Sequence, residues 1–162
     1  MNIDILFLNQ ELKVSKDLIS DQSLFEEYCK THSFEGKSNQ VIAMPASYSK
    51  NENLTYLVGL GDIKDSQDLY ELGINIGSKI KEDVEIDFLN TEINFVPIID
   101  GILYAQYKFN DYKSKDESAL NNIKFKKTDT IENEIKQSSI FWVRDQINTP
   151  CLLYTSPSPR DA

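Results

Sequence analysis

Residues 54–61 are Leu-Thr-Tyr-Leu-Val-Gly-Leu-Gly, and a longer amphipathic stretch from Asp65 to Lys81 follows them. The first stretch is an apolar run bounded by turn residues, which predicts a buried strand. Gly59 and Gly61 allow the chain to turn sharply after it. The second stretch carries apolar residues at helical spacing, namely Leu69, Leu72, Ile76 and Ile80. A strand, a glycine turn and an amphipathic helix in this order predict a unit of an α/β domain.

Four further stretches have the pattern of strands. Residues 3–8 are apolar on both faces, which predicts a central strand covered by helices. Residues 41–44 end at Pro45, and a polar turn leads from them into residues 54–59, so we expect these two strands to form a hairpin. Residues 84–88 and 123–125 alternate apolar and polar side chains. This alternation predicts one wet face, and we expect residues 84–88 to form a peripheral strand.

Capping and proline signals mark the helices. Asp65 or Ser66 can cap the helix after the glycine turn. Ser23 and Glu26 form a capping box at the start of an earlier helix. Pro97 marks the first turn of a nearly apolar helix. A second capping box, Asp129 to Glu132, opens a long helix that contains Ile131, Ile135, Trp142, Val143 and Ile147. Strands alternate with helices, so the predicted fold class is α/β, with a mixed or largely parallel sheet flanked by helices.

Composition limits the classes of partner. The chain has 162 residues, 40% hydrophobic and 27% charged, which is typical of one globular domain. No apolar run approaches the roughly 20 residues that span a bilayer, and the N-terminus lacks the features of a signal peptide. The net charge of −9 argues against a nucleic-acid surface, and the basic run Lys124, Lys126, Lys127 is too short to provide one. We expect a cytoplasmic protein that binds neither nucleic acid nor membrane.

The sequence contains no legible active site. His32 is the only histidine, and it follows the helix opened by Ser23. It could be a general base or a metal ligand, but a helix-end histidine near terminal carbonyls is favoured because no partner cluster is visible. Asp83, Glu85 and Asp87 fit the exposed face of a strand. We therefore predict no catalytic, cofactor-binding or metal-binding residue in this chain.

Two glycine motifs resemble parts of nucleotide-binding sites. Gly59-Leu-Gly61 resembles the start of a dinucleotide fingerprint, but Lys64 stands where a third small residue is needed. Gly36-Lys-Ser38 lacks the upstream glycine of a phosphate-binding loop. Neither motif supports nucleotide binding.

The last twelve residues, Cys151 to Ala162, differ from the rest of the chain. They form a Ser/Pro-rich stretch that cannot sustain a helix. Residues 151–161 also match one reading frame of a common transposase-type sequencing adaptor. We therefore expect residues 151–162 to be non-native and the gene to be interrupted after Pro150. Without them the net charge stays at −9, because Arg160 and Asp161 cancel, and Cys29 is the only cysteine, expected to be a small buried hydrophobe.

Three segments resemble the N-terminal domain of the leucyl aminopeptidase family, the two-metal cytosol aminopeptidases. The first is Tyr56–Gly61 with its helix. The second is residues 100–115, similar to the family's Glu-Gly-Leu-x-Leu-x-x-Tyr-x-Phe-Asp-x-Tyr-Lys-Ser/Thr-Lys, with Asp100 and Asn110 as departures. The third is residues 143–150, similar to Ala-Arg-Asp-Leu-Val-Asn-Thr-Pro, with Gln146 as a departure. The match runs in register from about Asn2 to Pro150, and the second and third segments are its most specific parts.

The resemblance implies a macro-domain-like fold over residues 1–128 that performs no chemistry itself. Residues 129–150 then correspond to the start of a linker helix toward a catalytic domain. In the family that domain holds two divalent metals, zinc or manganese, which activate water to remove N-terminal amino acids from peptides. The parent is expected to form a homohexamer. The family's Asn-Thr-Asp-Ala-Glu-Gly-Arg motif is absent, so no metal or catalytic residue carries over to this chain.

Two other functions stay open. A free-standing macro-type module would bind ADP-ribose through glycine-rich loops whose amides reach the diphosphate. After the first strand this chain offers only Asn9-Gln-Glu-Leu, and no glycine-rich loop lies near its last strand. The other is an α/β domain of unknown role.

Overall fold

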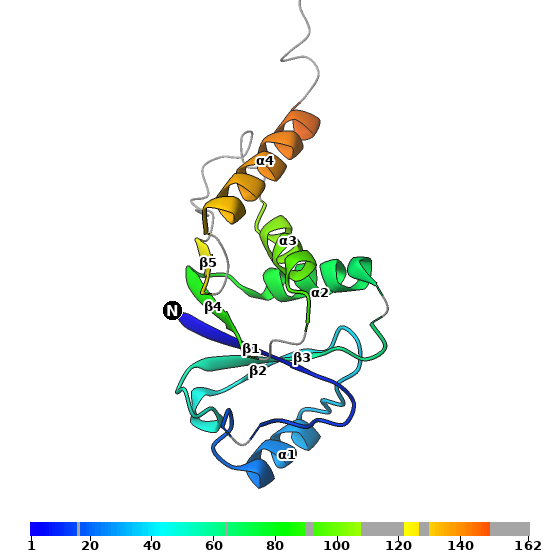
Figure 1. Ribbon diagram of the computed structural model, residues 1–162, viewed down its shortest axis with the longest axis vertical. Helices are drawn as coiled ribbons and strands as arrows, with labels where there is room; N and C mark the ends of the chain where they lie inside the picture. Colours follow the sequence, from blue (N-terminus) through cyan, green and yellow to red (C-terminus); the bar gives the residue numbers. More distant parts are fainter. Residues whose placement is uncertain (16, 64, 90–92, 108–121, 127–129, 150–162) are drawn as a thin grey trace, which may run out of the picture.

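The computed structural model describes residues 1–15, 17–63, 65–89, 93–107, 122–126 and 130–149, which form a five-stranded sheet with helices on both faces (Figure 1). The strands are β1 (Asn2–Leu8), β2 (Val41–Met44), β3 (Leu54–Gly59), β4 (Val84–Phe88) and β5 (Ile123–Phe125). The helices are α1 (Gln22–Thr31), the short 3₁₀ helix η1 (Ala46–Tyr48), α2 (Ser66–Lys79), α3 (Val96–Ala105) and α4 (Thr130–Asn148). The predicted α/β class is confirmed.

The sheet is mixed, with the order β2-β3-β1-β4-β5. Strand β1 lies in the middle and pairs in parallel with β3 on one side and β4 on the other. Its inner residues are buried on both faces, as the apolar stretch predicts. Strand β2 runs antiparallel to β3, which confirms the hairpin. Strand β5 extends the parallel part beyond β4.

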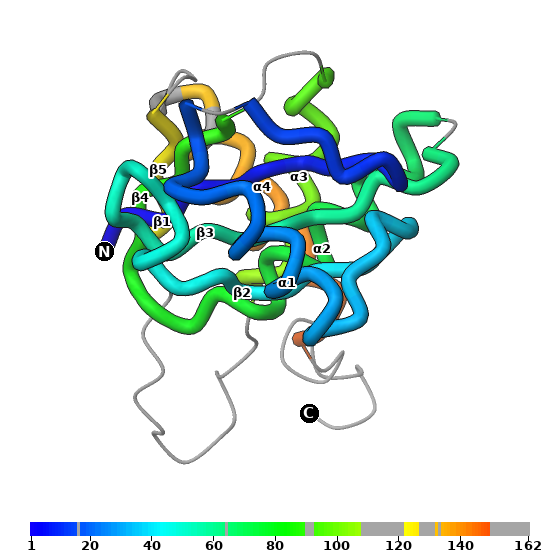
Figure 2. The backbone as a smooth tube through the Cα atoms, turned by 90° about the horizontal axis from the view of Figure 1, so that it is seen from below, coloured from blue at the N-terminus to red at the C-terminus, as the bar shows by residue number. Residues whose placement is uncertain are grey.

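The predicted peripheral position of β4 is wrong. β4 pairs with β1 on one side and with β5 on the other, so it is an inner strand. Its alternating pattern has a different cause. Val84, Ile86 and Phe88 face the core under α2 and α3, while Glu85 and Asp87 face the other side. Viewed from the α1 side, α1 lies over the β2 and β3 half of the sheet and leaves β4 and β5 uncovered (Figure 2).

Two apolar layers hold the helices to the sheet. The larger layer lies between the sheet and the helices α2 and α3, and includes Phe7, Leu72, Ile86 and Ile102. Phe88 stacks on Phe95 within it, with ring centroids 4.5 Å apart. The smaller layer lies under α1 and consists of buried residues from α1, β1, β2, β3 and their loops: Leu6, Leu8, Ile19, Phe25, Tyr28, Cys29, Phe34, Met44 and Leu57. Cys29 is buried there, as expected.

The helix caps follow the sequence signals in part. Asp65 caps α2, since its carboxylate accepts from the Asp68 amide at 2.9 Å. Pro97 lies in the first turn of α3, as predicted. At α1, however, Asp21 is the cap in place of Ser23, because the Asp21 carboxylate accepts from the amides of Ser23 and Leu24. The predicted cap at Asp129 lies outside the described residues.

Candidate functional site

In open α/β sheets, ligands usually bind in the crevice beyond the carboxyl ends of the strands. In this chain the segment from Ser33 to Gln40 lies in that position, against the ends of β1 and β3. The Gly61 amide donates to the Gly36 carbonyl at 2.9 Å, and the Gly59 amide donates to the Gln40 carbonyl at 2.8 Å. The chain therefore places its own backbone where a ligand would lie.

The contacts in this crevice leave no space for a diphosphate between the backbones. A Cβ atom added to Gly36 would lie 2.2 Å from the Asn9 carbonyl oxygen. One added to Gly59 would lie 2.1 Å from the Lys37 carbonyl oxygen. Gly36 and Gly61 also have positive φ angles, 67° and 51°, which favour glycine. Here the glycines allow the backbone segments to touch, and this explains Gly59-Leu-Gly61 without a nucleotide.

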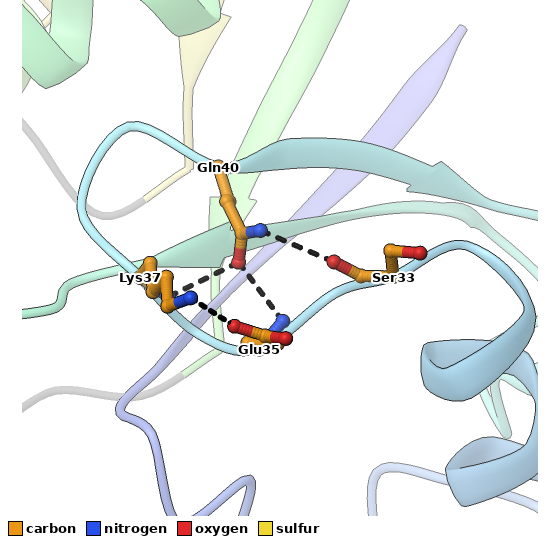
Figure 3. A network of polar contacts seen from close by, with 4 residues as sticks. All are labelled: Ser33, Glu35, Lys37 and Gln40. Atoms are coloured by element: carbon orange, nitrogen blue, oxygen red, sulfur yellow. Dashed lines mark hydrogen bonds and ion pairs between the residues drawn. The ribbon is translucent and has the colours of Figure 1, made fainter.

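A polar network fixes the segment that fills the crevice (Figure 3). The Gln40 side-chain oxygen accepts from the amides of Glu35 and Lys37, at 2.9 and 3.1 Å. The Gln40 side-chain nitrogen donates to the Ser33 carbonyl at 3.2 Å. Lys37 and Glu35 form an ion pair on the outer side. These residues satisfy one another, so their role here is structural.

His32 occupies the end of α1, which confirms the helix-end interpretation. It is the C-cap residue, and its Nδ1 donates to the Tyr28 carbonyl at 3.0 Å. Its ring stacks on the Tyr28 ring, with centroids 4.1 Å apart. Within the described residues, no group of three or more His, Cys, Asp or Glu side chains could hold a metal ion.

Asp4 is a buried carboxylate that the sequence analysis did not single out. It lies on β1 with only 1% of its surface exposed, among apolar neighbours in the sequence. Asn51 and Asn53, from the turn before β3, donate to its two oxygens at 3.1 and 3.2 Å. Asp4 therefore holds the turn against the sheet. Asp4 could have been noticed in the sequence, because it is the one charged residue in the apolar run 3–8.

The acidic residues near β4 also have structural partners. Asp83 Oδ1 accepts from the Asn122 amide at 2.8 Å and so helps to place the start of β5. Asp87 lies 4.0 Å from the Lys126 ammonium.

Comparison with known proteins identifies the family. The profile of the cytosol aminopeptidase family, N-terminal domain, matches residues 5–116. This chain belongs to that family. No curated protein matches the chain. The segment that matches the family's N-terminal domain covers most of the residues that the structure describes.

Solved structures of low sequence identity share the fold. A tomato leucine aminopeptidase mutant, K354E, has a TM-score of 0.61 and 17% identity, and covers 95% of this chain and 36% of its own. The bottromycin maturation enzyme BotP in complex with Mn has a TM-score of 0.65 and 15% identity. The match covers 99% of this chain and 34% of the BotP chain. A cytosol aminopeptidase from Coxiella burnetii has a TM-score of 0.56 and 16% identity. The match covers 91% of this chain and 31% of the Coxiella chain. The chain thus spans about a third of the length of these proteins.

The two most specific family-like segments meet in space. Tyr107, just after α3, donates to Asp145 of α4 at 2.8 Å. The Arg144 guanidinium lies over the rings of Tyr104 and Tyr107, with its Cζ 4.2 and 4.0 Å from the centroids. Arg144 also donates to the Tyr104 carbonyl at 3.2 Å. We call these four residues the α3–α4 contact. These contacts fix α4 against the end of α3.

Of the departures from the family pattern, Asp100 takes part in packing. Asp100 lies 3.6 Å from the Lys136 ammonium of α4, so it takes part in the same helix pairing. Gln146 is exposed on α4. Asn110 lies outside the described residues, as does the rest of the second segment beyond Tyr107.

A groove of about 540 Å³ lies between α1 and residues 11–14. Its floor is apolar and includes Leu12, Val14, Cys29 and Phe34, and its rim is charged. Burial, with a smaller contribution from Glu26, raises the pKa of the Cys29 thiol to about 11. A thiol with this pKa is protonated at neutral pH and is a poor nucleophile. The groove therefore offers space without a reactive group.

We expect Cys29 to react with thiol reagents only when the native structure opens. Its pKa of about 11 lies above the ordinary 9.0, so the native state favours the neutral thiol. The contribution of the neutral thiol to the stability of the native state is complete below pH 9. It is lost as the pH rises from 9 toward 11, because the thiol of the unfolded chain ionises first. The measurement is the alkylation rate with iodoacetamide at pH 8, with and without urea, in a Cys151→Ser variant. Fast alkylation of the folded chain would show that the thiol is accessible and ionised.

Proposed function

We propose that this chain is the non-catalytic N-terminal domain of a longer two-metal leucyl aminopeptidase, which removes N-terminal amino acids from peptides. Residues 1–128 form the domain, residues 129–150 begin a linker helix, and residues 151–162 are adaptor-derived. The catalytic domain is not evident in this chain. The two metals, zinc or manganese, belong to that separate domain, and no residue of this chain binds a cofactor or metal.

This proposal rests on the observation that the family-like segments pack against each other. Residues 100–107 and 143–149 are joined by the α3–α4 contact, in which polar side chains bind one another across two helices. A catalytic pair would instead leave a nucleophile, a base or a metal ligand open to substrate. The match to the family profile ends at residue 116, and the solved relatives are about three times as long as this chain.

The purified 162-residue chain is expected to show no aminopeptidase activity with added zinc or manganese. Two-metal hydrolysis needs a set of carboxylate ligands that holds both ions and activates water. The measurement is release of nitroaniline from leucine p-nitroanilide, with a commercial leucine aminopeptidase as the positive control. Metal-dependent turnover that co-purifies with the chain would refute the proposal.

The remaining properties of the parent belong to the same proposal. Its partners are peptide substrates and further copies in a homohexamer, with neither nucleic acid nor membrane, and its location is the cytoplasm. The macro-like character of the fold is likewise proposed. None of the helices in the described part of the chain combines the length and hydropathy of a bilayer crossing. The net charge of −9 disfavours binding to phosphate backbones.

We expect the chain not to bind ADP-ribose. A macro-type module needs loop amides that are free to bind a diphosphate. Here the Gly59 and Gly61 amides already donate to the backbone of residues 36–40. Isothermal titration with ADP-ribose at 25 °C tests this, with a known macro domain as the control. Micromolar binding would favour the free-standing module over the aminopeptidase domain.

A further inference from the structure

Large apolar side chains are exposed mainly on one helix. Among the described residues, seven large hydrophobic residues are exposed, and four of them lie on α4. The other three, Met1, Leu24 and Val96, are scattered over separate elements. The four on α4 are Ile135 (62% exposed), Trp142 (65%), Val143 (48%) and Ile147 (75%). Single exposed hydrophobic residues need no explanation, but four on one 19-residue helix do.

These four residues share one side of α4. Their spacing of seven, eight and twelve residues from Ile135 places them within about two fifths of the helix circumference. We call them the α4 stripe. The opposite side of α4 carries Phe141 and Arg144, which contact Tyr107. α4 is therefore anchored on one side, and the four residues of the stripe on its other side are exposed. Figure 1 shows α4 at the edge of the structure, beyond α3 and away from the sheet.

We propose that the α4 stripe is the docking surface for the catalytic domain that follows it in the full-length protein. This inference rests on the proposed function. The solved relatives match 91–99% of this chain, which includes α4, but only 31–36% of their own length. The family profile describes an N-terminal domain, so the remaining length follows the matched part. Of the described elements, α4 lies nearest to it in sequence and carries the apolar surface.

A second copy of the chain fits the α4 stripe less well than the catalytic domain does. The four side chains can bury on the order of 400–500 Å² per chain. A stable interface between two proteins needs about 800 Å² from each partner. The net charge of −9 on each copy also opposes self-association, and exposed Glu132 lies on the same side of α4 as the stripe. A folded domain on the same polypeptide avoids both problems, because it is tethered and can contact neighbouring surfaces as well.

The test compares two proteins that carry the same substitutions. Trp142→Gln and Ile147→Gln are introduced together into the 162-residue chain and into the full-length protein from the intact gene. Glutamine keeps the helix propensity, so α4 itself should form. The matched control is Leu24→Gln, which removes an exposed apolar side chain from α1. The measurements are thermal unfolding and sedimentation of each variant at several concentrations.

In the 162-residue chain both variants should keep the parent Tm within about 1 °C, because the replaced side chains are largely exposed. In the full-length protein the double variant should lower the Tm by at least about 5 °C, while Leu24→Gln changes it little. Trp142 is the only tryptophan of the 162-residue chain, so its emission there should be that of a water-exposed indole.

Two results would overturn the proposal. One is an unchanged Tm of the full-length double variant. The other is a dimer of the 162-residue chain that the double variant dissociates, which would make a second copy the occupant. Peptide hydrolysis by the unmodified full-length protein tests the proposed function separately. A full-length protein that is destabilised by the stripe variants but has no peptidase activity would retain the docking surface and refute the aminopeptidase.

Discussion

Replacing Gly101 with alanine is expected to lower the free energy of unfolding by about 2–3 kcal/mol, despite the better helix propensity of alanine. Gly101 lies on α3 where that helix crosses α2. A Cβ atom at this position would lie 2.2 Å from the Tyr70 carbonyl oxygen and 2.9 Å from the Ile74 amide nitrogen. Both contacts are with helix backbone, which cannot rotate away. The two helices must therefore separate, and the packing beneath them is lost.

The same crossing has glycine on both sides. A Cβ atom on Gly73 of α2 would lie 2.3 Å from the Ile98 carbonyl oxygen of α3. Gly73→Ala is therefore expected to act in the same direction as Gly101→Ala, and the pair should be non-additive because one separation of the helices relieves both clashes. The measurement is thermal or urea unfolding, and the expected decrease in Tm is about 5–10 °C for each single variant.

A suitable control is Ser78→Ala, on the exposed side of α2. Ser78 makes only a local bond to the Asn75 carbonyl, so its replacement should change the free energy of unfolding by less than about 0.5 kcal/mol. If Gly101→Ala were as stable as the parent chain, the close contact of α2 and α3 would be incorrect.

Replacing Arg144 with alanine is expected to release α4 while leaving the sheet intact. The guanidinium lies over two tyrosine rings and donates to the Tyr104 carbonyl. Each cation–π contact contributes about 0.5–1 kcal/mol at a partly exposed site, and a charge-assisted hydrogen bond adds about 1.5 kcal/mol. Together these contributions amount to roughly 2.5–3.5 kcal/mol of local stability, so we expect amide protection in α4 to fall by about 70–400-fold.

Hydrogen exchange measures this effect residue by residue. Arg144→Lys keeps the charge but loses the flat stacking group and the second donor, so it should restore only part of the protection. Lys136→Ala is the matched control on α4, because this half-exposed lysine forms only ion pairs with Asp100 and Glu132. Its effect should stay below about 1 kcal/mol. Equal loss of protection in β1 and α4 would show that Arg144 supports the whole fold.

Most elements of the fold follow from local patterns. The periodicity of residues 54–61 and 65–81, the double-faced apolar run 3–8 and the proline at position 97 each predict an element that the structure contains. Errors arose where the deciding contact is remote. Strand β4 has a one-sided pattern because α1 does not cover it, and the neighbour that makes it an inner strand lies about 35 residues further along the chain. At α1, Asp21 and Ser23 lie only two residues apart and either could act as the cap, and the carboxylate of Asp21 provides it.

The site was harder to predict, since its features depend on contacts between distant segments. No local pattern shows that residues 36–38 lie against Asn9 and Gly61 and fill the crevice. The same holds for Asp4, whose partners Asn51 and Asn53 lie nearly fifty residues away. The long helix could be predicted from its apolar residues, but the sequence did not indicate that Arg144 would anchor one side and leave Trp142 exposed.

The central claim is that the chemistry of this protein is encoded outside the 162 residues. The most direct measurement is the nucleotide sequence of the intact gene beyond the codon for Pro150. We expect the reading frame to continue through a second domain that carries the aspartate, glutamate and lysine ligands of a two-metal site. A genomic copy whose reading frame ends naturally with residues 151–162 would contradict this account.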